Sequence, residues 1–122
     1  IRDGRFQVNT LRRGQTSAVN TMNMFNTTPV PGSEWVLASV TFYCDLDSSS
    51  TCNTTLMDIE MVGSLGVVYS RPIFAVLDNP FNGEIFGGGS KTGVIGFIVQ
   101  ANDSHLSIAI NDLGDRTFFQ AE

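Results

Sequence analysis

Charged residues and histidine are scarce in this chain, and their scarcity excludes several classes of function. Only 16% of its 122 residues are charged, against about 25% in typical globular proteins. There is one lysine, Lys91, and one histidine, and the net charge is −5. Nucleic-acid binders need a basic surface, so this composition argues against a nucleic-acid partner. No run of about 18 apolar residues is present, so the sequence predicts no transmembrane helix.

The composition that remains is typical of one folded domain. Hydrophobic residues make up 42% of the chain, which suffices for a packed core. We expect a single domain over residues 1–122, with residues 1–33 as an N-terminal strand and linker region. Ser, Thr and Asn supply about a quarter of the residues, a composition that suits a secreted or envelope protein. The chain begins with Ile1, so we expect a processed fragment whose signal peptide or lipid anchor lies upstream.

The first 13 residues carry a charge opposite to that of the rest of the chain. They contain four arginines and one aspartate, Asp3. These arginines either meet lipid head groups or an acidic partner, or they are solvated residues that protect an edge strand from pairing. We favour the edge strand.

The hydrophobic pattern has period two along most of the chain and predicts an all-β fold. Segments rich in Gly, Pro, Asn and Asp separate the alternating segments and favour turns. No segment has a sustained helical period, and only residues 71–77 have the pattern of a short helix or irregular turn. We therefore expect an antiparallel β-sandwich of about seven to nine strands. The expected strands include residues 5–9, 34–44, 57–61, 95–100, 106–111 and 117–120, and the expected core residues are Val36, Val40, Phe42, Ile59, Phe97, Val99, Ile108 and Ile110.

Two cysteines flank a Ser-rich turn. Cys44 ends the strongest predicted strand, and Cys52 follows eight residues later. They form either a disulfide across a chain reversal, a pair of buried thiols, or half of a metal site. Structural zinc requires four ligands at short spacings, and the chain has one histidine. We favour the disulfide, which implies an oxidising compartment.

Two motifs suggest catalysis or phosphate binding, and both have a simpler interpretation. His105 follows Ser104 and Asp103 in a predicted turn, where neighbouring residues rarely adopt the geometry of a Ser-His-Asp relay. The segment Gly87–Thr92 resembles a phosphate-binding loop, but it lacks the Gly before Lys91 and leads into a strand rather than a helix. We interpret them as a surface histidine and a flexible turn.

Acidic pairs and glycosylation sequons occur without the context that would make them diagnostic. Asp45 with Asp47, and Asp58 with Glu60, are candidates for calcium binding or glycoside hydrolysis, although no calcium-loop motif is present. Acidic residues on the solvent face of a strand are the alternative. Sequons begin at Asn26, Asn53 and Asn102, and they matter only in a eukaryotic secretory host.

Three aromatic residues are candidates for a ligand-binding face. Trp35, Tyr43 and Tyr69 could form a platform for a carbohydrate or another small ligand. Trp35 and Tyr43 fall on the face of their strand opposite the main hydrophobic stripe. The alternative, which we favour, places all three in or near the core.

From Glu34 onward the sequence resembles a known family over about 85 of its 122 residues. The matching segments are Trp35–Phe42, Gly66–Tyr69, Gly83–Val99 and Leu106–Ile110. Their order and spacing are similar to those of the immunoglobulin-like domains of uncharacterised bacterial lipoproteins catalogued as telomeric repeat-binding factor 2. Secreted immunoglobulin-like antigens of mycobacteria are also similar. The sequence departs from the family at Gln100, where proline is frequent, and in its cysteine loop.

This resemblance implies an immunoglobulin-like sandwich that is exported, and either tethered or secreted. It implies no activity, no cofactor and no catalytic residue. We therefore expect a non-enzymatic module that binds a protein or an envelope component. The alternatives are a small-ligand or carbohydrate-binding module that uses the exposed aromatics, and an enzyme that uses His105 or the acidic pairs.

Overall fold

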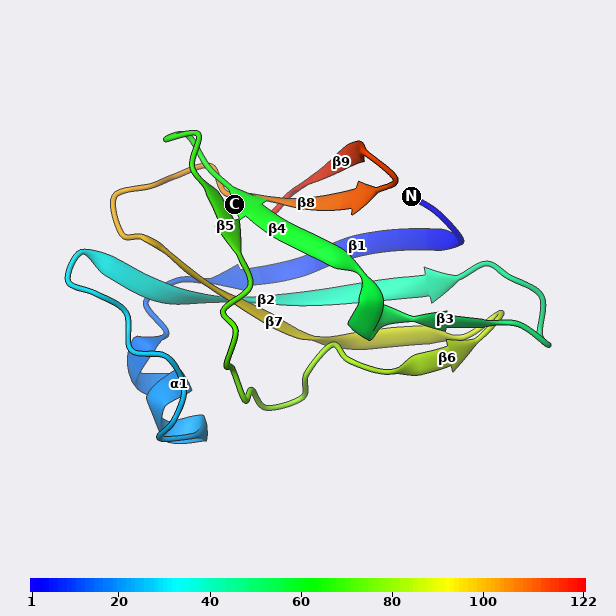
Figure 1. The fold of residues 1–122 in the computed structure, drawn as a ribbon, viewed down its shortest axis with the longest axis horizontal. Coiled ribbons are helices and arrows are strands. Elements are labelled where there is room, and N and C mark those ends of the chain that lie inside the picture. The colour runs from blue at the N-terminus through cyan, green and yellow to red at the C-terminus, as the bar shows by residue number, and fades with distance from the viewer.

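The structure is a computed structural model that describes residues 1–122 (Figure 1). It contains nine β-strands, one α-helix and one 3₁₀ turn. The strands are β1 (Gly4–Arg12), β2 (Ser33–Cys44), β3 (Thr51–Asn53), β4 (Asp58–Val62), β5 (Val68–Ser70), β6 (Glu84–Phe86), β7 (Ser90–Gln100), β8 (Ser107–Asp112) and β9 (Asp115–Gln120). The helix is α1 (Thr16–Met22), and the 3₁₀ turn is η1 (Thr54–Leu56).

The strands form two antiparallel sheets and a short ribbon. One sheet has the order β1-β2-β7, the other has the order β5-β4-β8-β9, and β3 pairs with β6 beside them. Every strand pairing is antiparallel. The all-β sandwich predicted from the alternating pattern is therefore confirmed, and the number of strands lies within the expected range.

The core lies between the two sheets, where the alternating side chains of each sheet face one another. Val36 and Val40 of β2 pack in one cluster with Ile59 of β4 and with Ile108 and Ile110 of β8. All eight predicted core residues belong to this cluster and are buried. Burying each such side chain contributes about 1.5–3 kcal/mol, so these contacts are the main source of stability.

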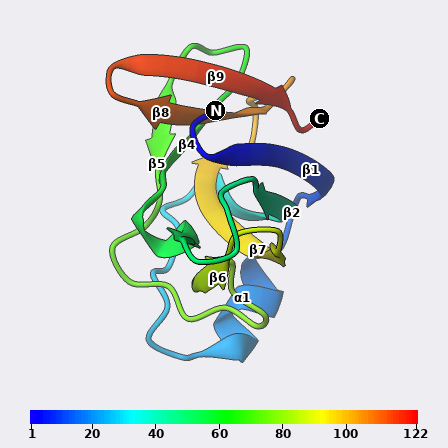
Figure 2. The same ribbon diagram turned by 90° about the vertical axis from the view of Figure 1, so that its right-hand side faces the viewer.

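A second, smaller cluster lies on the outer face of the β1-β2-β7 sheet, under α1. Val19 of the helix packs against Trp35 and Leu37 of β2, and all three are buried. Gly96 of β7 leaves room for the indole, because a Cβ at this position would lie 2.9 Å from Trp35 Cζ3. Figure 2 shows the resulting three layers, with α1 below one sheet and the other sheet above.

The helix is the main element that the sequence pattern did not predict. It has seven residues, no side-chain cap at Gln15 and no acidic residue in its first turn. Within residues 1–33, the expected strand is present, but the expected linker contains this helix. Residues 71–77 form no helix, so the irregular alternative is correct there. The chain has no helix with the length and hydrophobicity that a bilayer crossing requires.

Candidate functional site

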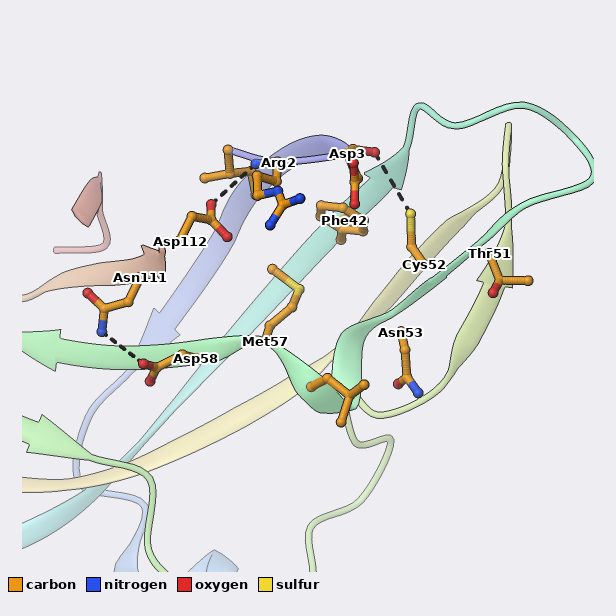
Figure 3. A pocket seen from close by; sticks show the side chains of 12 residues that line it. Arg2, Asp3, Phe42, Thr51, Cys52, Asn53, Met57, Asp58, Asn111 and Asp112 are labelled. Carbon is orange, nitrogen blue, oxygen red and sulfur yellow. Dashed lines mark hydrogen bonds between the residues drawn. The ribbon is translucent and has the colours of Figure 1, made fainter. Parts of the chain in front are cut away.

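A hollow opens at the end of the sandwich where the N-terminal segment, the β3–η1 segment and the end of β8 meet (Figure 3). Its volume is about 510 Å³, within the range of small-molecule sites. The apolar lining includes Phe42 of β2, Cys52 of β3 and Met57, which follows η1. The polar lining residues are Arg2, Asp3, Thr51, Asn53, Asp58, Asn111 and Asp112.

The polar groups of this end hollow are partly held by contacts with one another. The backbone N–H of Arg2 donates to Asp112 Oδ2 at 3.2 Å. Asn111 Nδ2 donates to Asp58 Oδ2 at 3.2 Å and to Glu60 Oε1 at 2.6 Å. Carboxylate, amide, hydroxyl and guanidinium groups therefore share one hollow and offer both donors and acceptors. The structure has no group of three or more His, Cys, Asp or Glu side chains placed to hold a metal ion.

The predicted disulfide is present and borders the end hollow. Cys44 and Cys52 are bonded, with their Cα atoms 6.0 Å apart, and no free cysteine remains. Cys52 Sγ lies 3.8 Å from the backbone oxygen of Asp3; a disulfide sulfur has no hydrogen to donate, so this is a packing contact. Within the closed loop, Asp47 Oδ1 accepts hydrogen bonds from the hydroxyl and N–H groups of Ser49, which lower its pKa.

The His105 cluster lies at the opposite end, where the β4–β5 and β7–β8 turns meet. His105 is exposed, with a positive φ of 52°. Its Nδ1 lies 3.1 Å from Ser64 Oγ and 3.2 Å from Ser104 Oγ. No hydrogen bond joins the carboxylate of Asp103 to the imidazole. The Ser-His-Asp relay is therefore not assembled, and His105 is a surface turn residue as predicted.

Asp103 organises this turn. It is buried, and Tyr69 donates its hydroxyl to Oδ2 at 2.7 Å. The N–H groups of Leu65 and Ser104 donate to Oδ1 at 3.0 and 2.8 Å. Burial alone would raise the pKa of Asp103, but the hydrogen bonds outweigh it and the pKa is lowered. Burial and the hydrogen bond to Asp103 raise the pKa of Tyr69.

The three aromatic candidates do not form an exposed face. Trp35 is fully buried under α1, and its Nε1 donates to the backbone oxygen of Thr27 at 2.9 Å. Tyr69 is buried in the core between the sheets. Tyr43 is half-buried, with the guanidinium carbon of Arg5 4.8 Å from its ring centroid. Trp35 and Tyr69 therefore lie in the core, as we favoured, and the exposed aromatic face on which the small-ligand alternative depended is not formed, because the helix and the opposite sheet cover two of the three.

The other candidate motifs have structural roles. Residues 87–92 make the β6–β7 turn and enter a strand, as expected. Asp45 pairs with Arg5 at 3.1 Å, away from Asp58 and Glu60, which contact Asn111.

The three sequons lie in different environments. Asn26 is buried, and Asn53 Oδ1 accepts from the N–H of Thr55 at the start of η1. Asn102 is exposed in the β7–β8 turn. Only the first is therefore inaccessible in the folded protein.

A cluster of exposed apolar residues, the apolar loop surface, lies beside α1, and no sequence motif predicts it. We define it as Met24 and Phe25 after the helix, with Ile73, Phe74 and Val76 from the segment between β5 and β6. Met24 is 83% exposed and Phe25 73% exposed, and Ile73 is fully exposed. Large apolar side chains that two loops expose to solvent beside one another are a candidate for an interaction site.

The side chain of Asn26 holds the two segments of this surface together. Asn26 is 4% exposed and donates from Nδ2 to the backbone oxygens of Val19 and Val76, at 3.0 and 2.9 Å. The N–H of Val76 donates back to Asn26 Oδ1 at 2.6 Å. Thr27 Oγ1 adds a bond to the oxygen of Phe74 at 3.2 Å. The sequence carries one signal of this surface, because residues 14–33 contain no charged residue.

No family model, curated protein or solved structure matches the chain.

Proposed function

We propose that this chain is a non-enzymatic, exported β-sandwich module that binds a partner protein through the apolar loop surface. One observation carries the proposal: large apolar side chains point into solvent from two loops that a buried asparagine fixes from beneath. A fixed apolar surface is preorganised, so little conformational entropy is lost when a partner covers it.

The surroundings of this surface favour a protein partner over a lipid bilayer. A hollow of about 210 Å³ lies beside Ile73 and Ala75, with Leu77 and Val94 in its wall. A side chain of a protein partner can fill such a hollow, whereas a bilayer has no shape to match it. The loop surface also lacks Trp, Tyr and Lys, which anchor proteins at membrane interfaces, and the net charge of −5 repels anionic lipid.

Support for a non-enzymatic role comes from the arrangement of the reactive side chains. His105 contacts only hydroxyl groups, and Asp103 is committed to Tyr69 and two backbone N–H groups. Support for export comes from the disulfide, which persists in oxidising compartments, and from the resemblance to lipoprotein domains. The immunoglobulin-like arrangement of the strands and the lipid anchor belong to this proposal as well.

The proposal is tested by site-specific photo-crosslinking. A photoreactive phenylalanine at Phe74, incubated with envelope extract of the producing cell, is expected to give one saturable protein adduct. The adduct should disappear in the Phe25→Ser, Ile73→Ser variant and persist in Leu113→Asn, which changes an equally exposed residue of the β8–β9 turn.

Two outcomes would overturn the proposal. The first is an adduct that does not depend on Phe25 and Ile73. The second is co-flotation of the protein with phosphatidylcholine vesicles, lost in the same double variant, which would identify lipid as the partner.

A second candidate function is the binding of a small polyhydroxylated ligand in the end hollow. The mixture of donors and acceptors around an apolar lining favours a sugar, which presents hydroxyl groups and a C–H face. Saturation-transfer NMR with a panel of disaccharides should show contacts that Asp58→Ala removes and Asp115→Ala retains. Absence of contacts with every disaccharide would exclude this function.

A further inference from the structure

The outer face of the β5-β4-β8-β9 sheet is the one broad face of the sandwich without a covering element. The outer face of the other sheet carries α1, whereas no helix lies over this one (Figure 2). Its apolar residues are Val62 of β4, Val68 of β5, Ala109 of β8 and Phe118 of β9, which we call the outer sheet face. Val62 pairs with Val68, and Ala109 pairs with Phe118 and, on its other side, with Glu60. The four apolar residues lie around one hollow, which Glu60 also lines.

A protruding ring and a hollow lie side by side on this patch. Phe118 is 59% exposed. Phe118 forms part of the wall of a hollow of about 230 Å³, which Val62, Val68 and the buried Ala109 also line. An apolar cavity of about 150 Å³ holds a benzene ring, so this hollow has room for the ring of a phenylalanine.

We infer that the outer sheet face is the contact of a symmetric homodimer, in which Phe118 of each copy enters the hollow of the other. A two-fold contact requires a surface that is complementary to itself, and a ring beside a ring-sized hollow meets that requirement. This inference stands on residues other than those of the proposed function, and the apolar loop surface lies on the opposite side of the sandwich.

The charges around the patch are compatible with a second copy. Glu60 and Arg116 border the hollow and form an ion pair at 3.2 Å. Each copy therefore brings one acidic and one basic group to the same border, so the charges of two copies balance. A strongly acidic partner would repel Glu60, and a strongly basic partner would repel Arg116.

The size of the face predicts a weak dimer. The strands β5, β4, β8 and β9 have three, five, six and six residues. At about 3.4 Å per residue and about 4.8 Å between strands they present roughly 330 Å² per copy, less than half of the roughly 800 Å² per partner that a stable complex buries. We therefore expect association that depends on concentration. A dimer of this geometry would also leave both apolar loop surfaces free, so it could bind two partner molecules.

Sedimentation velocity of the complete chain over micromolar to millimolar concentrations tests the inference. The weight-average mass is expected to rise from 13.2 kDa toward twice that value. Phe118→Ser should weaken self-association at least tenfold. Ala109→Met, which fills the hollow, should do the same, while Leu113→Asn in the adjacent turn should leave it unchanged.

Circular dichroism of each variant shows whether the sandwich has folded, so a loss of dimer is not confused with a loss of structure. A monomer at every concentration would overturn the inference. So would a dimer that survives Phe118→Ser, or one that the Phe25→Ser, Ile73→Ser variant removes instead. A monomer, or a dimer that survives Phe118→Ser, leaves the expected crosslink at Phe74 unchanged, so the two proposals fail separately.

Discussion

At the scale of single residues, Asp103 shows how one buried carboxylate fixes a turn. Its three hydrogen-bond donors come from Tyr69 of β5, Leu65 of the β4–β5 turn and Ser104 of its own turn. Gly63 is required beside it, because a Cβ at that position would collide with the carboxylate. The same residue that suggested a relay with His105 therefore has a structural role.

We expect Asp103 to make stability depend on pH in the acid range. Its folded pKa lies below the value of about 3.9 for a free aspartate, so its ionised form stabilises the folded state. This contribution is complete above about pH 5 and is lost as the pH falls through the folded pKa. Urea unfolding between pH 7 and pH 2.5 should show this loss. Asp103→Asn should be less stable at pH 7 by about 1–3 kcal/mol and should lose less stability on acidification. Equal acid dependence in the two proteins would contradict this role.

The candidate residues differ in how far the sequence could place them. Cys44 and Cys52 were placed correctly because a short loop between strand ends limits where their side chains can go. A position of Trp35 in or near the core was predicted, but the helix that covers it was not, because alternation assigns a face of a strand and not what covers that face. The covering helix is too short, and too poor in apolar residues, to leave a periodic signal.

At the scale of elements, Arg13 joins four segments at one end of the sandwich. Its guanidinium donates to Glu34 at the start of β2 and to Glu122 after β9. It also donates to the backbone oxygens of Asp103 and Ala101 in the β7–β8 turn. Only a planar group with several donors can satisfy all of these acceptors at once.

We therefore expect Arg13→Lys to destabilise the protein although the charge is kept. An ammonium group cannot reproduce the set of hydrogen bonds, and a loss of about 1–2 kcal/mol in the free energy of unfolding is expected. The matched control is Arg12→Lys, because Arg12 is exposed and forms no ion pair or side-chain hydrogen bond. Chemical denaturation measures both. Equal effects at positions 12 and 13 would show that the contacts of Arg13 contribute little.

The disulfide loop is the second feature that stabilises the arrangement of elements. The bond between Cys44 and Cys52 closes a short loop, which limits the conformations of the unfolded chain and contributes about 2–3 kcal/mol. Both cysteines are buried in the core cluster, so the variant Cys44→Ala, Cys52→Ala, which buries no new hydroxyl group, should lose at least that amount and keep the fold. Thiol titration of the denatured, non-reduced wild type should find no free sulfhydryl. Two free thiols there would contradict the bond.

At the scale of the whole molecule, the sandwich followed from the sequence because the alternating strands leave few other ways to bury their apolar sides. Which elements cover the outer faces of the two sheets could not be predicted from the sequence. Nothing in the period-two pattern shows that one outer face carries a helix and the other is bare, or that loops distant in sequence meet beside α1. Such contacts depend on single side chains such as Asn26, whose role has no periodic signature.

Substitutions in the apolar loop surface and at Asn26, which supports it, should have opposite effects on stability and on crosslinking. This difference separates a binding surface from the residue that holds it in place. Phe25 and Ile73 are exposed, so Phe25→Ser, Ile73→Ser should change the free energy of unfolding by less than about 0.5 kcal/mol while it removes the Phe74 crosslink. Asn26→Ala leaves buried backbone groups of Val19 and Val76 without partners, so it should cost about 1–3 kcal/mol. Hydrogen exchange should then show faster exchange at Val76 in Asn26→Ala and unchanged exchange in the double variant. If the double variant were instead strongly destabilised, these apolar side chains would stabilise the folded chain itself. They would then not be free to contact a partner.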